Sequence, residues 1–215
     1  MSMRMFSLMI VAGLIAAGVL ITLRGLMKLD RDQDMEISAK EWSMLMAGSL
    51  ITACIWTVMT DGEAAAVKIA WLVIHIYFLS CMLTGSMTCQ VYDIFQYPGV
   101  VAAGFIVLYK QGSMAVGISL LLFAMLQYVI FMRLYGAADG MAFLVAALAE
   151  GSLCYDINIY LFHMIMAYLM LALVQVCRGN VGMKGRLKKP VPFVPYISFS
   201  FWMILVLGER INICI

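Results

Sequence analysis

Long apolar runs alternate with short polar connections along the chain. Many of the runs come close to the length of about 20 residues at which an α-helix crosses a bilayer. None has the alternating ten-residue pattern of a membrane barrel strand, and lipid offers unpaired backbone groups no partner. The pattern therefore predicts an all-α, polytopic transmembrane bundle of about eight spans, forming a single domain over residues 1–215. The runs cover residues 6–27, 43–59, 65–84, 94–109, 113–133, 141–155, 157–177 and 193–208.

Composition supports a membrane environment. Of the 215 residues, 65% are hydrophobic and 12% are charged, and the charged fraction is about half that of an ordinary soluble domain. The net charge of +2 is too small to indicate a nucleic-acid partner, so the lipid bilayer is the expected surrounding. The first apolar run has no small-residue cleavage site and continues through Arg24 into a charged loop, which indicates a retained span.

Neither the cysteines nor the histidines form a recognisable metal-binding pattern. The six cysteines lack paired C-x-x-C spacing, so we expect buried small hydrophobic side chains rather than a zinc site or a disulfide scaffold. His75 and His163 each stand alone in an apolar run, without a second ligand three or four residues away. We therefore expect interior histidines, and neither a metal nor another cofactor.

Charge asymmetry predicts the orientation of the chain. The connection "CRGNVGMKGRLKKP" carries five basic residues and no acid, so the positive-inside rule places it in the cytoplasm. Counting back one span at a time places 85–93 and 133–140 on the same side. Asp93 and Asp139 lie in these two segments, and two spans separate them, so they face one compartment whatever the absolute orientation. The sequence thus predicts two acids at one membrane face.

Each acid also has a simpler explanation. Aspartate is a favoured helix N-cap, and Asp139 directly precedes an apolar run. Asp93 could likewise cap or turn the chain ahead of the run that contains Pro98. Glu150 and Asp156 flank a short connection on the opposite face, where we expect both to be solvated.

Two motifs carry a resemblance to a known family. The segment "YGAADGMAFLVAALAEG" resembles the G-x-G-D motif of type IV prepilin peptidases, and "KKPVPFVPYISFSF" resembles that family's later basic and proline-containing segment. The similarity covers roughly residues 65–205. The resemblance implies a multi-pass intramembrane aspartic endopeptidase of the bacterial inner membrane. Its implied partners are the precursors of type IV pilus-like proteins, whose basic leader it would remove at the cytoplasmic face.

The match departs from the family pattern at several positions. Ala138 replaces the second glycine, and Met141 stands where the family has lysine. The family's proline spacing places its first catalytic aspartate at Gly85, at a distance from Asp139 close to the family's usual separation. The alternative takes Asp93 as that acid, and its Tyr-Asp pair resembles the related presenilin-type proteases. We favour Gly85 as the aligned position.

The choice matters because aspartic proteolysis needs two carboxylates. One keeps a proton and polarises the scissile carbonyl, while the other is charged and takes a proton from water. Asp93 would complete the pair with Asp139, whereas Gly85 would leave it incomplete. Gly136 and Ala138 keep the backbone narrow, so an extended substrate peptide could lie against it.

Three functions therefore remain open. The first is an active prepilin-type peptidase that uses Asp93 and Asp139. The second is a catalytically impaired homologue that binds pilin-like helices without cutting them. The third is a small multi-pass transporter that uses the same two acids for cation or proton coupling.

Overall fold

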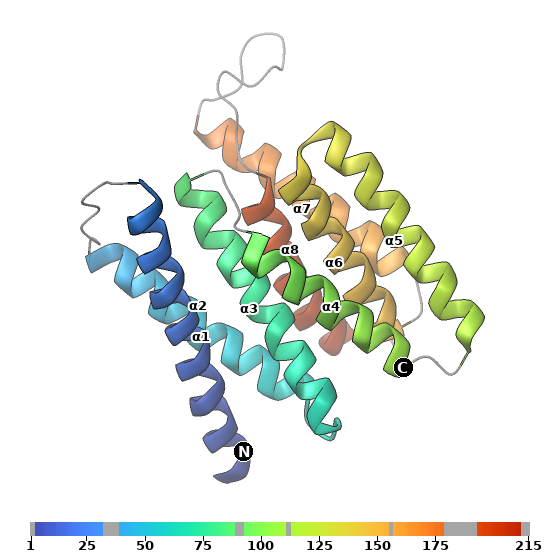
Figure 1. The fold of residues 1–215 in the computed structure, drawn as a ribbon, viewed down its shortest axis with the longest axis horizontal. Helices are drawn as coiled ribbons and strands as arrows, with labels where there is room; N and C mark the ends of the chain where they lie inside the picture. The colour runs from blue at the N-terminus through green and yellow to red at the C-terminus, as the bar shows by residue number, and fades with distance from the viewer. Residues whose placement is uncertain are drawn as a thin grey trace.

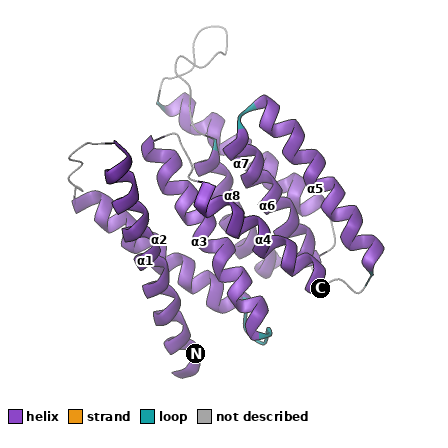
Figure 2. Ribbon diagram, in the orientation of Figure 1, coloured by secondary structure: helices purple, strands orange, loops and turns teal. Residues whose placement is uncertain are grey.

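The prediction of an all-α protein is confirmed. The computed structural model describes residues 3–31, 39–88, 93–110, 113–154, 157–178 and 193–211, and this part of the chain contains helices and no strand (Figure 2). Each predicted apolar run overlaps one helix. The helices are α1 (Met3–Arg31), α2 (Ala39–Met59), α3 (Ala65–Thr88), α4 (Asp93–Lys110), α5 (Met114–Leu134), α6 (Ala137–Cys154), α7 (Ile157–Cys177) and α8 (Val194–Ile211).

Within the described ranges, four helices are long and apolar enough to cross a membrane, so the chain is a membrane protein. The number of eight spans and their orientation stay predictions. α2 and α8 contain shorter apolar stretches, Met46–Met59 and Val194–Val206. The four candidate spans are Met5–Leu26 in α1, Ala65–Thr84 in α3, Met114–Leu134 in α5 and Asn158–Cys177 in α7.

α6 is the central helix of the bundle. It contacts α3, α4, α5, α7 and α8, whereas α1 and α2 pack against each other and against α3 at one side (Figure 1). Every residue from Ala142 to Ser152 is buried. Ala142, Ala146 and Ala149 keep one face of this stretch narrow, and small side chains let neighbouring membrane helices approach closely.

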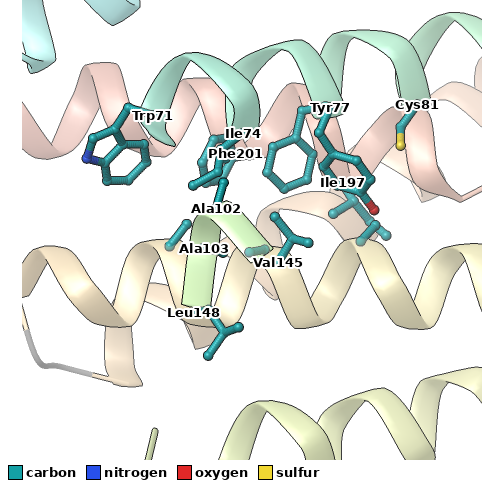
Figure 3. Close-up of a cluster of buried hydrophobic side chains, with 14 of the residues drawn as sticks. Trp71, Ile74, Tyr77, Cys81, Ala102, Ala103, Val145, Leu148, Ile197 and Phe201 are labelled. Carbon is teal, nitrogen blue, oxygen red and sulfur yellow. The ribbon is translucent and has the colours of Figure 1, made fainter. Parts of the chain in front are cut away.

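An aromatic and aliphatic core joins α3, α4, α6 and α8. The Phe78 ring of α3 stacks on Phe201 of α8 at 4.2 Å between ring centroids. Ala102 and Ala103 of α4 belong to the same buried cluster as Val145 and Leu148 of α6 (Figure 3). This core fixes the position of α3 relative to α6, and α6 carries Asp139.

The cysteines are only partly as expected. Cys81 is a buried thiol, as predicted, but Cys54 and Cys177 are exposed on the surface of the bundle, so the prediction is wrong for these two. A thiol is apolar enough to face lipid, and Cys54 and Cys177 lie on helices of an apolar bundle. The side chains of the other three cysteines lie outside the described residues.

Candidate functional site

The site begins at the tight junction between α5 and α6. Only Tyr135 and Gly136 separate the two helices, and Gly136 has φ of 134°, a conformation that residues with a side chain rarely adopt. The Gly140 N–H donates to the Gly136 carbonyl at 3.0 Å, which begins α6. A Cβ at Gly140 would lie 3.0 Å from the backbone nitrogen of Met132. Glycine on each side of Asp139 therefore allows the backbones of α5 and α6 to come together here.

Asp139 lies inside the first turn of α6 and not at its N-cap, so that simpler explanation is wrong. The helix has already begun at Ala137. The Asp139 carboxylate instead accepts a hydrogen bond from the backbone N–H of Val194, the first residue of α8. Its Oδ1 atom is buried and has no hydrogen-bond partner among the described residues. The carboxylate thus joins the N-termini of two helices, both of which favour negative charge.

Burial changes the acidity of Asp139, which lies outside the four candidate spans. Loss of solvent raises its pKa from 3.8 to about 6, although the hydrogen bond from Val194 acts in the opposite direction. The carboxyl group therefore exchanges its proton close to neutral pH, as a general acid or base requires.

One wall of the site comes from α3. Tyr77 and Cys81 lie one helical turn apart on this helix (Figure 3). Both are buried, and both interact electrostatically with Asp139. Gly99 of α4 sets the place of Tyr77, because a Cβ at Gly99 would lie 2.7 Å from the Tyr77 Cγ atom. The α3–α4 crossing thus brings a phenol and a thiol next to Asp139.

A second wall is aromatic and comes from α7 and from the residues next to the ends of α5 and α8. The Tyr168 hydroxyl donates to the Tyr135 hydroxyl at 2.8 Å. The Tyr168 ring lies 4.8 Å from the ring of Phe193, the residue directly before α8. Tyr168 also interacts electrostatically with Asp139. Three segments therefore converge on the first turn of α6.

The other predicted site residues lie on the helices around Asp139. Gly85 belongs to α3 and lies four positions after Cys81, so helical periodicity places it on the same face one turn further on. Asp93 is the first residue of α4, but its side chain lies outside the described residues, as does the connection 89–92. Ala138 is partly buried against the core. The pairing of Asp93 with Asp139 stays a prediction.

A second polar site lies further along α6, and sequence reasoning missed it. Glu150 is fully buried, so the prediction of a solvated side chain is wrong. Its Oε1 atom lies 2.8 Å from the Nδ1 atom of His163. The Nε2 atom of His163 lies 2.9 Å from the Ile197 carbonyl oxygen, which confirms His163 as an interior histidine. Asp156, predicted to be solvated with Glu150, lies outside the described residues.

His75 is also an interior histidine, as predicted. It is fully buried, and the Trp202 indole N–H donates to its Nδ1 atom at 3.2 Å. Among the residues that the structure describes, no three His, Cys, Asp or Glu side chains come together as a metal site.

Comparison with known proteins gives no relative of this chain. No family model, no curated protein and no solved structure matches it. The resemblance to type IV prepilin peptidases accordingly depends on the two sequence motifs alone.

Proposed function

We propose that this chain is a membrane-embedded aspartic endopeptidase of the prepilin type, with Asp139 as one of its two acids. It would cleave the leader of pilin-like precursors at the cytoplasmic face of the bacterial inner membrane. The observation that supports this most directly is the state of Asp139. One oxygen of its carboxylate is buried and has no hydrogen-bond partner in the part of the chain that the structure describes, and its pKa is raised to about 6.

The raised pKa suits Asp139 to the role of the protonated acid. In this proposal Asp139 donates a hydrogen bond to the scissile carbonyl oxygen, while a second, charged carboxylate removes a proton from water. The resulting hydroxide attacks the carbonyl carbon, and the C–N bond then breaks as the amine leaves with a proton. Asp93 is the second acid in this scheme.

Open space beside the first turn of α6 supports a role in holding a peptide. A Cβ at Gly136 would meet no other atom within 4 Å, so a substrate backbone could approach at this point. Gly136 and Ala138 are the proposed contact positions. The basic leader of a precursor would lie near the acid, and its apolar helix would stay in lipid.

A second candidate function is binding of pilin-like helices without cleavage. It is supported by the periodicity of α3, which places Gly85 on the face that carries Tyr77 and Cys81 towards Asp139. A glycine there supplies no carboxylate, so Asp139 would stand alone unless Asp93 reaches it.

A cleavage assay distinguishes the two candidates. The protein is reconstituted in liposomes with a pilin-like precursor, and the wild type is compared with Gly85→Asp, Asp93→Ala and Asp139→Asn. Cleavage by the wild type that disappears in both Asp93→Ala and Asp139→Asn supports the active peptidase. Cleavage only by Gly85→Asp, lost again when Asp139→Asn is added, supports the binding protein.

The cleavage assay has a control variant and results that would contradict both candidate functions. Asp61→Asn removes an exposed acid in the turn after α2 and should leave any cleavage unchanged. Absence of both cleavage and precursor binding in every variant contradicts both candidates. Cation or proton flux that requires Asp139 in the absence of proteolysis would instead support the transporter.

A further inference from the structure

Glu150 and His163 bring an acid and a base together inside the bundle. Both side chains have 0% exposure, and the Glu150 Oε1 and His163 Nδ1 atoms are 2.8 Å apart. Glu150 belongs to α6 and His163 to α7, the two helices of a hairpin with a short connection. The Ile197 carbonyl of α8 lies 2.9 Å from the other ring nitrogen of His163. Three helices thus meet at one titratable pair.

The contacts of His163 determine where its protons lie. A carbonyl oxygen only accepts hydrogen bonds, so the Nε2 atom that faces Ile197 carries a hydrogen. The Nδ1 atom then faces Glu150 Oε1 at 2.8 Å. Without a proton between them, the lone pair of Nδ1 would face a negatively charged oxygen, which is repulsive. One proton therefore belongs to this contact, either on the ring or on the carboxyl group.

Few other groups act on this proton. Among the described residues, those that interact electrostatically with Glu150 are His163 and Tyr160, both on α7. From α8 the pair meets the Ile197 carbonyl and the Phe201 ring, whose centroid is 6.1 Å from that of His163. From α5, Leu120 packs against Gly151 next to Glu150. With one proton the pair is neutral overall, which is the least costly state for burial.

Two buried oxygens beside the pair remain open. The Glu150 Oε2 atom and the Tyr160 hydroxyl have no hydrogen-bond partner among the residues described, and the Glu150 Oε1 and His163 Nδ1 atoms have only the 2.8 Å contact that joins them as an ion pair. Oε2 can therefore accept a proton while Oε1 keeps its contact with His163. A purely structural ion pair would normally use both carboxylate oxygens, because an unpaired buried oxygen is destabilising.

We propose that Glu150 and His163 form a proton-binding site inside the membrane-embedded bundle, with one proton shared across the α6–α7 contact and Glu150 Oε2 open for exchange. Proton loss leaves a carboxylate facing a neutral imidazole. Proton gain at Oε2 leaves an imidazolium beside a neutral carboxylic acid. The ligand is the proton itself, and the site does not depend on the proposed peptidase activity, because Asp139 lies eleven residues earlier on α6, or about 16 Å along the helix.

Nitrogen NMR of labelled histidine tests the proposal directly. The chain has only two histidines, so the wild-type protein in lipid nanodiscs gives two ring systems. His75 serves as the internal reference, because its Nδ1 accepts a hydrogen bond from Trp202. We expect the Nδ1 signal of His163 to be shifted from that of His75 towards a protonated nitrogen, and the shift to disappear in Glu150→Gln. The His75 signals should not move.

Proton uptake gives a second, independent measurement. Glu150→Gln keeps a side chain of the same shape, whose amide can still donate to His163, but it cannot bind a proton. On acidification from alkaline to neutral pH, the wild type should take up more protons than Glu150→Gln. Glu63→Gln, at the partly exposed contact with Lys110, is the matched control and should take up as many as the wild type.

The contrary results are clear. Equal proton uptake by the wild type and Glu150→Gln would overturn the proposal, as would His163 signals that match those of His75 and ignore Glu150→Gln. If Glu150→Gln does not fold, the wild-type spectrum decides alone. In that case, a His163 Nδ1 signal identical to that of His75 at every pH would overturn the site.

Discussion

Asp139 and Glu150 are two acids on one helix in different surroundings. Asp139, in the first turn of α6, keeps partial contact with solvent and accepts one backbone hydrogen bond from Val194. Glu150, near the other end, is completely buried and lies against His163. The partner of the first acid is a neutral backbone donor, whereas the partner of the second is a basic side chain.

The difference teaches how an apolar bundle can hold a carboxylate. At the end of a helix, backbone N–H groups and nearby water can stabilise the charge, so Asp139 needs no basic partner. In the bundle interior no such groups are free, so a buried acid must be neutralised by a proton or a cation. In the two proposals made above, the acid of the first kind acts on a substrate and the acid of the second kind binds a proton.

The largest expected effect comes from removing the partner of Glu150. His163→Leu should destabilise the protein by about 3–5 kcal/mol, because it leaves an unpaired acid in the interior. The measurement is the thermal unfolding temperature in detergent. The double variant Glu150→Leu with His163→Leu should recover much of the loss. If the single and the double variant are equally destabilised, the pair does not interact as described.

The next effect concerns the wall beside Asp139. Gly99→Ala places a methyl group 2.7 Å from the Tyr77 Cγ atom, and Tyr77 must move, at a cost of about 1–3 kcal/mol. Gly104→Ala is the matched control on the same helix, since its Cβ meets nothing within 4 Å. That variant should be neutral or slightly stabilising. Equal destabilisation by both would show that the crossing of α3 and α4 is not tight.

A smaller, pH-dependent effect is expected at Asp139. Its pKa is raised from 3.8 to about 6, so the stability present at low pH is lost as the pH rises through about 6. Asp139→Asn removes this loss and should be more stable than the wild type at pH 7, by about 1–2 kcal/mol given the remaining solvent contact. Unfolding temperatures measured across this pH range check the sign. Equal stability of the two proteins at every pH would contradict a buried carboxyl.

The smallest effect should come from a third acid. Glu63 is only partly buried and contacts Lys110 at the end of α4. Partly exposed ion pairs contribute about 0–1 kcal/mol, so Glu63→Gln should shift the unfolding temperature little, and less so at high salt. A loss as large as that of His163→Leu would mean that burial does not separate these acids.

The helices were largely predictable from the sequence, and the surroundings of the acids were not. Apolar runs of near-span length specify helices because lipid leaves the backbone no other choice. The hydrogen bond from Val194 to Asp139 joins residues 55 positions apart, and no local pattern indicates such a contact. For Asp139 the sequence located the residue, but the alternative explanation as an N-cap is wrong, because α6 begins at Ala137 and the carboxylate accepts a hydrogen bond from Val194 of α8.

For Glu150 the sequence contained an indication of burial that the prediction did not use. It was expected to be solvated because it lies near the end of an apolar run, close to Asp156. However, His163 lies at a similar distance on the other side of the connection between α6 and α7. In a helical hairpin these two positions come to the same level, and a lone acid opposite a lone base within apolar helices indicates a pair.

Because Asp139 and Glu150 lie near opposite ends of one buried helix, α6, a movement of this helix changes the position of both. Its two carboxylates are attached to one stiff rod, and each is tied to a different neighbour, Val194 of α8 or His163 of α7. Sliding the rod far enough to pull Asp139 away from α8 would also draw Glu150 out of register with α7. A crosslink that immobilises either end of α6 should therefore restrain the other end. A displacement of the helix at one acid should also change the contacts of the second acid.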